Sequence, residues 1–265
     1  MNFADRYGSW AIVAGASEGL GAEYARQLAS RGLNLVLIAR RRELLQSLAT
    51  RLTAKYGIRT KLLALDLSAP DAAEQIVQKT MDIDLGLLVY NAAYSAVGPF
   101  LDRSMDEHLR EVHTNIHSPL KLVYLLSQRF HGRGRGGVLL MASLSAFQGS
   151  PYISTYAATK AFNIVLAESL WEEWRARNVD VLVCISGAVS TPNYLASQPK
   201  RTGGLGDRSM SPEQCVEEAL VALGKQPYII PGRMNRLASF VMRYLVPRRL
   251  AIQYMGKVLY GMYGK

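Results

Sequence analysis

The sequence has little cysteine and no long apolar run, and both shortages narrow what the chain can be. Cys184 and Cys215 are its only cysteines in 265 residues, too few for the disulfide framework of a small secreted domain. No stretch of about 18 uncharged apolar residues is present, so a membrane-spanning helix is excluded. The first ten residues carry Asp5 and Arg6 and lack the apolar core of a secretory signal. We therefore expect a cytoplasmic protein.

Acidic residues are also missing from the C-terminal part, where Glu218 is the last acid of the chain. The formal net charge is +10. The bases that follow Glu218 are Lys225, Arg233, Arg236, Arg243, Arg248, Arg249, Lys257 and Lys265. Most of the positive excess is therefore local. A local basic surface favours an anionic partner, such as a phosphate group, an anionic lipid or an acidic protein.

What the sequence has is a regular alternation of short apolar runs and helical patterns. Hydrophobic residues make up 49% and charged residues 20%, which is typical of a globular domain and not of disorder. The expected strands are Trp10–Ala14, Leu33–Ala39, Thr60–Leu65, Leu85–Tyr90, Gly137–Ala142, Val179–Ile185 and Tyr228–Ile230. The expected helices lie near 19–31, 42–56, 70–80, 104–131, 154–177 and 211–223. This order predicts an α/β fold with a doubly wound, Rossmann-like parallel sheet of about seven strands.

The C-terminal residues have a different sequence pattern from the rest of the chain. We expect a dinucleotide-binding catalytic domain over 1–230 and a basic extension over 231–265, built as two amphipathic helices separated by Pro247. Two interpretations of the extension stay open. Its apolar faces pack over the substrate pocket or a subunit interface, or they rest on an anionic membrane or an acidic carrier. Residues 192–210 form the one long irregular segment.

A glycine-rich turn follows the first expected strand. Gly15, Gly19 and Gly21 are spaced G-x-x-x-G-x-G where the strand gives way to a helix. Such glycines allow a tight turn and let backbone N–H groups approach a pyrophosphate at the helix N-terminus. The turn therefore indicates a dinucleotide site.

Arginines end the second expected strand, where many dinucleotide sites place an acid. Arg40, Arg41 and Arg42 precede Glu43, the first carboxylate after the strand. Guanidinium groups suit a 2′-phosphate, which a carboxylate would repel. The alternative is a solvated start of the next helix. Asp66, after the third strand, is a candidate contact for the adenine ring.

Polar side chains gather at the carboxyl ends of later strands and on one helix. Tyr156 and Lys160 are four residues apart and therefore share a helix face. A nearby ammonium favours the phenolate and lowers a phenol pKa, which gives a proton donor usable near neutral pH. Ser143 and Asn91 end two strands at the edge where parallel sheets bind ligands. Asn115 lies inside an expected helix, for which it is a mediocre helix former.

Taken together, these residues resemble the short-chain dehydrogenase/reductase family over about residues 8–230. Asn115, Ser143, Tyr156 and Lys160 match that family's catalytic tetrad. The resemblance implies hydride transfer between a nicotinamide and a carbonyl carbon, with Tyr156 giving or taking the proton. It also implies that Lys160 lowers the Tyr156 pKa, that Ser143 binds the substrate oxygen and that Asn115 positions a water molecule.

The resemblance also assigns the cofactor site, and with the three arginines it predicts NADP(H). The implied cofactor-binding residues are Gly15, Ser17, Gly19, Leu20, Gly21, Arg40, Arg41, Asp66, Leu67, Asn91, Ala92, Tyr156, Lys160, Gly187, Val189 and Thr191. The chain departs from the family pattern at Ala14, Ala93 and Ser186, where Thr, Gly and Pro are usual.

Aromatic and apolar residues beside these motifs predict an apolar ketone or secondary alcohol as substrate, of the steroid, fatty-acyl or aromatic class. The candidates for the pocket wall are Tyr94, Val97, Ser145, Phe147, Tyr152, Tyr194 and Leu195. His113 and His117 are spaced as a metal pair could be, but no third ligand is evident and we expect no metal. We expect a homodimer or homotetramer and no nucleic-acid partner. The alternative function is a catalytically silent NADP(H)-binding protein that uses its basic C-terminal helices for interaction.

Overall fold

A computed structural model describes residues 3–196 and 209–264 of the chain. Its centre is one parallel sheet of seven strands in the order β3-β2-β1-β4-β5-β6-β7. The strands are β1 (Trp10–Ala14), β2 (Asn34–Ala39), β3 (Thr60–Ala64), β4 (Leu85–Tyr90), β5 (Gly136–Ser143), β6 (Val179–Ser186) and β7 (Tyr228–Ile229). The predicted α/β class, the doubly wound sheet and all seven strands are confirmed.

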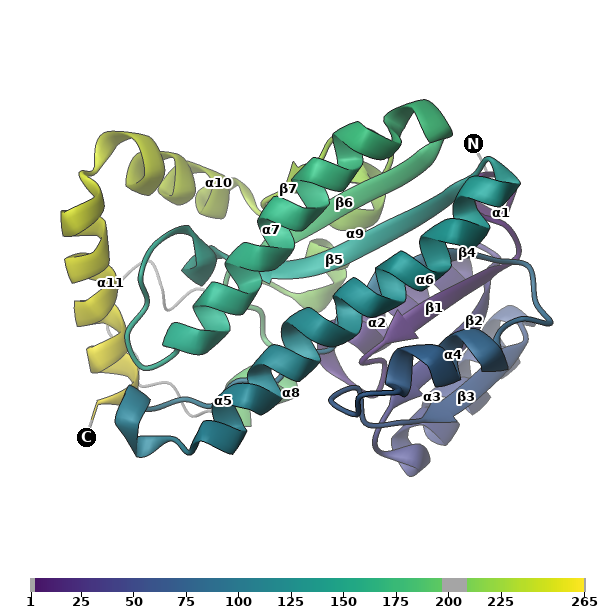
Figure 1. Ribbon diagram of the computed structural model, residues 1–265, viewed down its shortest axis with the longest axis horizontal. Helices are drawn as coiled ribbons and strands as arrows, with labels where there is room; N and C mark the ends of the chain where they lie inside the picture. The colour runs from purple at the N-terminus through teal and green to yellow at the C-terminus, as the bar shows by residue number, and fades with distance from the viewer. Residues whose placement is uncertain (1–2, 197–208, 265) are drawn as a thin grey trace.

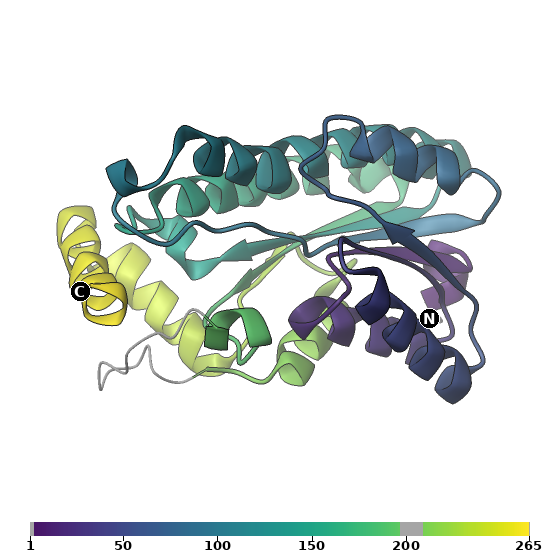
Figure 2. The same ribbon diagram turned by 90° about the horizontal axis from the view of Figure 1, so that it is seen from below.

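Helices cover both faces of this sheet, as Figures 1 and 2 show. One face carries α1 (Phe3–Tyr7), α2 (Gly19–Ser30), α3 (Arg42–Tyr56) and α9 (Pro212–Ala222). The other carries α4 (Ala72–Lys79), α6 (Ser118–Arg133) and α7 (Ser154–Trp174). Strands such as β1 and β4 are buried along their whole length. Burial on both faces explains why their sequences read as continuous apolar runs.

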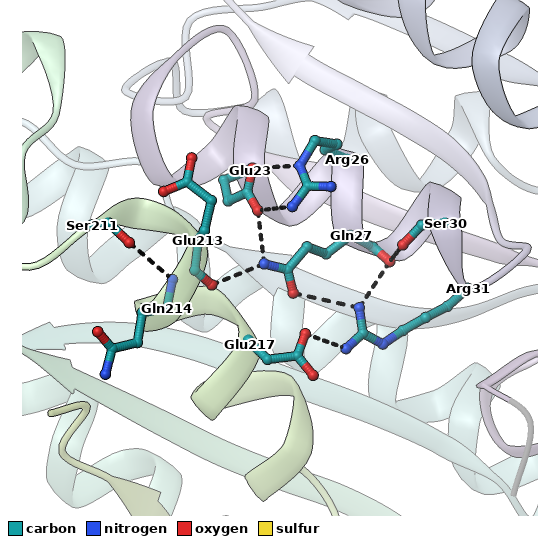
Figure 3. Close-up of polar contacts among 9 residues, drawn as sticks. All are labelled: Glu23, Arg26, Gln27, Ser30, Arg31, Ser211, Glu213, Gln214 and Glu217. Carbon is teal, nitrogen blue, oxygen red and sulfur yellow. Dashed lines mark hydrogen bonds and ion pairs between the residues drawn. The ribbon is translucent and has the colours of Figure 1, made fainter.

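Polar contacts join α2 and α9, which lie side by side although they are far apart in the chain (Figure 3). Gln27 donates from Nε2 to the backbone carbonyl oxygen of Glu213 at 2.9 Å. Arg31 donates to a carboxylate oxygen of Glu217 at 2.7 Å. The C-terminal end of α2 is thereby fixed to α9, and α2 begins at the glycine turn.

The strand order reverses between β1 and β4. From β1 the chain adds β2 and β3 toward one edge of the sheet, and from β4 it adds β5, β6 and β7 toward the other. A crevice forms outside the carboxyl ends of strands at such a switch point. The single helix expected over 104–131 is three elements in the structure. These are α5 (Met105–Val112), the π-helical turn η2 (His113–His117) and α6.

The C-terminal residues form the two helices that the sequence predicts, separated by Pro247. They are α10 (Arg233–Phe240), continued by the π-helical turn η6 (Val241–Leu245), and α11 (Arg248–Tyr263). Both lie at one end of the molecule, beyond the carboxyl ends of β5 and β6 (Figure 1). The short helix α8 (Pro192–Ala196) was not expected. Among the described residues, no helix combines the length and the apolar character needed to cross a bilayer.

Candidate active site

A cavity of about 310 Å³ lies at the carboxyl edge of the sheet, around the switch point. Most of the expected cofactor-binding residues line it. They are Gly15, Ser17, Gly19, Leu20, Arg40, Arg41, Asp66, Leu67, Asn91, Ala92, Tyr156, Lys160 and Thr191. Gly21, Gly187 and Val189 lie outside the lining. The cavity therefore joins the glycine turn to two members of the expected tetrad.

The glycine turn is packed too closely for other side chains. Gly15 has a φ of +82°, and a Cβ there would lie 2.7 Å from the Ala92 backbone. A Cβ on Gly21 would lie 1.8 Å from the carbonyl oxygen of Gly15. The Asn91 side chain donates from Nδ2 to that same oxygen at 3.1 Å. These contacts hold the start of α2 beside the cavity, with the backbone N–H groups of its first turn available to an anion.

Two arginines stand at the end of β2 on the cavity wall. Arg41 forms an ion pair with Glu18 at 2.6 Å and donates to the Ser17 hydroxyl at 3.2 Å. Arg40 lines the same cavity, and its charge helps to lower the pKa of Asp66. The cavity is therefore cationic where β2 ends, which fits a dinucleotide that carries a further phosphate.

Asp66 receives a contact that the sequence analysis missed. Its carboxylate accepts hydrogen bonds from the backbone N–H and the hydroxyl of Ser68, and Arg110 lies 3.4 Å away. Burial opposes the lowering of its pKa, which the Ser68 hydrogen bonds and Arg110 bring about. The Arg110 guanidinium also lies over the Tyr94 ring, 4.8 Å from its centroid. Arg110 is 44 residues from Asp66 in sequence, so no local pattern announces the pairing.

Tyr156 is half-buried in the first turn of α7 and lines the cavity. Burial raises the pKa of its phenol to about 12, while a hydrogen bond with Ser143 opposes the rise. Ser143, at the end of β5, also accepts a hydrogen bond from the Ser145 hydroxyl at 3.0 Å. The sequence predicted a Tyr156 pKa below the ordinary value. Burial moves the pKa in the opposite direction here.

Lys160 lies one turn after Tyr156 and is 3% exposed. Its Nζ donates to the Met141 carbonyl oxygen at 3.0 Å and lies 5.6 Å from the centroid of the Tyr156 ring. Burial lowers the pKa of the Lys160 ammonium to about 8. The expected pairing of phenol and ammonium on one helix face is therefore present.

Asn115 lies in η2 and is fully buried. Its Oδ1 accepts from the Tyr94 N–H at 2.9 Å, and its Nδ2 donates to the Tyr94 carbonyl at 2.8 Å and to Thr159 Oγ1 at 3.0 Å. Its own carbonyl accepts from Asn163 at 3.2 Å. Asn115 thus ties the chain after β4 to α7, and it does not line the cavity itself.

The segment after β6 folds back over the glycine turn. Thr191 lies 3.0 Å from the place where a Cβ on Gly19 would stand. The Thr191 N–H donates to the Val189 carbonyl at 2.7 Å. Val189 pairs with Met210 in an isolated bridge. Of the segment 192–210, the part over 197–208 lies outside the described residues.

The expected pocket residues are spread over several surroundings. Tyr94 lines the cavity together with Tyr156 and Lys160. Phe147 lines a second cavity, of about 340 Å³, between α7 and the C-terminal helices. Tyr152 has a φ of +65° and packs edge-on against Tyr260 of α11 at 5.2 Å. Leu195 is exposed on α8. The half-buried remainder comprises Val97, Ser145 and Tyr194.

The two histidines of η2 contact each other, with the rings of His113 and His117 at 5.7 Å in an edge-to-face arrangement. In the part of the chain that the structure describes, no group of three histidine, cysteine or acidic side chains is placed to hold a metal ion.

Comparison with known proteins agrees with this geometry. A family model described as short chain dehydrogenase matches residues 9–201. A 7beta-hydroxysteroid dehydrogenase of Clostridium sardiniense is 34% identical over 236 residues, which are 89% of this chain and 90% of the relative. A structure solved to study 7beta-hydroxysteroid dehydrogenase stereoselectivity superposes with a TM-score of 0.91 at 31% identity, over 96% of this chain and 99% of that one. A short-chain dehydrogenase from Sphingobium yanoikuyae in complex with NADPH gives 0.76 at 27% identity, over 84% and 86%.

Proposed function

The chain belongs to the short-chain dehydrogenase/reductase family, and from this premise we infer that Asn115, Ser143, Tyr156 and Lys160 are its catalytic residues. The protein is an NADP(H)-dependent oxidoreductase that interconverts a ketone and a secondary alcohol on an apolar substrate. The observation that carries the assignment of residues is the cavity in which the Tyr156 phenol and the Lys160 side chain share a wall with the glycine turn.

The chain's own residues fit NADP(H). The close-packed turn at Gly15 and Gly21 would hold the pyrophosphate at the start of α2. Arg40 and Arg41 would hold the 2′-phosphate, and Asp66 would contact the adenine. When bound, the cofactor supplies or accepts the hydride. Residues 1–230 would thus form the catalytic domain and 231–265 an extension of it.

Proton transfer is the task of the tetrad. In ketone reduction, the Tyr156 hydroxyl donates its proton to the carbonyl oxygen. Ser143 hydrogen-bonds the same substrate oxygen and orients it. Lys160 stabilises the phenolate that forms, and Asn115 fixes the segment at Tyr94, which lines the cavity.

We propose a steroid ketone as the substrate class, because the Clostridium sardiniense relative is a 7beta-hydroxysteroid dehydrogenase. A panel of steroid, aromatic and 3-oxoacyl ketones, followed by the loss of NADPH fluorescence, tests both the reaction and the class. Turnover of steroid ketones is expected. Turnover of none of the panel, with NADPH bound, would favour the catalytically silent alternative.

We propose that the exposed face of α6 and α7 binds a second copy of the chain. Leu120, Tyr124 and Val165 are large apolar side chains exposed there. Apolar groups of this size on one face are typical of a subunit interface. Light scattering after gel filtration is expected to give a homodimer or homotetramer, and a monomer at all concentrations would contradict this.

The two C-terminal helices have different surroundings. The packing interpretation therefore suits α11, and the membrane interpretation suits α10 with η6. On α11, Ala251 and Leu259 are buried against the rest of the molecule, as the packing interpretation expects. On α10 and η6, Leu237, Phe240 and Tyr244 are more than half exposed. We propose that these side chains, together with the bases around them, give peripheral contact with an anionic membrane at its cytoplasmic face.

Cosedimentation with anionic vesicles at low and high salt tests the membrane contact, with neutral vesicles as the control. Binding to anionic vesicles that salt weakens is expected. No binding at low salt would contradict the contact, and burial of the same side chains in the oligomer would then explain them.

A further inference from the structure

A buried acid on α5 has no part in the chemistry described so far. Glu111 is 1% exposed. Its Oε1 accepts a hydrogen bond from the Ala96 backbone N–H at 2.5 Å. Acidic side chains are rarely buried to this extent, because the desolvation of a carboxylate is costly. Burial accordingly raises the pKa of Glu111, while the Ala96 hydrogen bond and the nearby His108 oppose the rise.

Glu111 lies one turn before Asn115, and both side chains hold the segment that follows β4. Asn115 binds both backbone groups of Tyr94, and Glu111 binds Ala96 two residues later. Tyr94 lines the cavity that contains Tyr156. The position of this part of the cavity wall therefore depends on two buried side chains that project from consecutive helical turns.

The same helix is fastened to the start of α7. His108 contacts the Phe100 carbonyl through Nε2 at 3.0 Å and the Thr155 hydroxyl through Nδ1 at 2.9 Å. Thr155 immediately precedes Tyr156. Through α5, the segment after β4 and the start of α7 are parts of one hydrogen-bonded unit, and Glu111 is a buried acid within it.

The charge of Glu111 reaches the catalytic phenol. Burial is the main cause of the raised pKa of Tyr156, and the negative charge of Glu111 adds to it, as does Tyr263 near the end of α11. The Ser143 hydroxyl has the opposite effect from β5, and the Lys160 ammonium stands 5.6 Å from the ring on α7 itself. A carboxylate opposes the formation of a second negative charge nearby. Glu107, which also belongs to α5, raises the pKa of Glu111 in turn.

We propose that Glu111 is a positioning residue that anchors the segment 94–98 to α5 and keeps the proton on Tyr156 for ketone reduction. The inference rests on the proposed function of Tyr156 as the proton donor. Glu111 thus has two separable effects. Its carboxylate oxygen accepts the Ala96 hydrogen bond, and its negative charge acts on the Tyr156 phenol.

Glu111→Gln and Glu111→Ala separate these effects. The glutamine keeps an oxygen for the Ala96 N–H but loses the charge. For Glu111→Gln we expect the KM for the ketone to stay within about twofold of wild type. We also expect the alkaline limb of the pH profile of kcat/KM to move to lower pH by at least about half a unit. For Glu111→Ala we expect the same shift with a KM raised about fivefold or more. Asp106→Asn, an exposed acid on the same helix, is the control and should leave both unchanged.

Hydrogen exchange of the peptide over 94–98 measures the anchor without turnover. Exchange should be faster in Glu111→Ala than in wild type and nearly unchanged in Glu111→Gln. Wild-type exchange in the alanine variant would overturn the anchor. An unshifted alkaline limb in Glu111→Gln would overturn the effect on Tyr156. Loss of NADPH binding in Glu111→Gln would also overturn the proposal, since it would make Glu111 a residue of the fold. If wild type reduced no ketone, the proposed function would fail, and exchange would still decide the anchor.

Discussion

Arg41 Nη2 lies 2.6 Å from Glu18 Oε1, so one of the two cations at the end of β2 is already paired with an acid of the glycine turn. Both side chains line the cavity, and the exposed fraction is 52% for Arg41 and 37% for Glu18. A 2′-phosphate would have to share Arg41 with this carboxylate and would be repelled by it. Arg40 lines the same wall.

This pairing predicts that Glu18→Gln tightens NADPH binding. Removing the carboxylate frees Arg41 and removes a like charge near the phosphate, so the Kd for NADPH should fall about threefold at low salt. The Kd for NADH should change much less. Fluorescence titration of both cofactors measures the effect, and equal changes for the two would show that Glu18 does not act on the 2′-phosphate.

Cofactor preference depends on Arg40 and Arg41 together. Charge-assisted hydrogen bonds contribute about 1.5–3 kcal/mol each, so wild type should prefer NADPH over NADH at least about tenfold in kcat/KM. Arg40→Asp should reduce or reverse this preference, mainly by weakening NADPH. Steady-state kinetics with both cofactors on wild type and variant decide it. Equal use of the two by wild type would leave the arginines as a solvated start of α3.

The buried ammonium of Lys160 makes stability depend on pH in a defined direction. Its pKa is about 8 in the folded protein and 10.5 ordinarily, so between these values the unfolded chain holds a proton that the folded chain has lost. The stability of the folded protein therefore rises with pH in this window. Below the window, the folded protein bears the full cost of burying the charged Lys160 ammonium. Relative to Lys160→Met, wild type should gain about 2 kcal/mol between about pH 7 and pH 9.5.

Urea unfolding of wild type and Lys160→Met at the two pH values measures this gain. The window stays below the ordinary pKa of tyrosine, so the raised pKa of Tyr156 contributes little to it. A difference in stability that stays constant with pH would contradict a lowered Lys160 pKa.

The sheet could be predicted from sequence almost to the residue, because each strand is a buried apolar run between turn signals. Trp10–Ala14 and Leu85–Tyr90 are examples in which the predicted and observed bounds coincide. The glycine turn was equally readable, since Gly15 and Gly21 have local spacing that a helix start requires.

The parts that could not be predicted depend on contacts between distant segments. The turn η2 lies within what the sequence reads as one helix, and Asn115 within it binds Tyr94, 21 residues away. The pairing of Arg110 with Asp66 spans 44 residues. Glu111 reads as a polar residue of an exposed helix face, and only the fold places Ala96 against it. Local patterns carry none of this information.

The role of Tyr156 is tested most directly by Tyr156→Phe. The substitution removes only the hydroxyl, so the fold and the affinity for NADPH should survive. General acid catalysis is typically worth about 10²–10⁴-fold in rate. The measurement is kcat for ketone reduction together with the Kd for NADPH from fluorescence titration. We expect a fall in kcat of at least about a hundredfold, with the Kd within about twofold of wild type. A variant that reduces the ketone at the wild-type rate would contradict it.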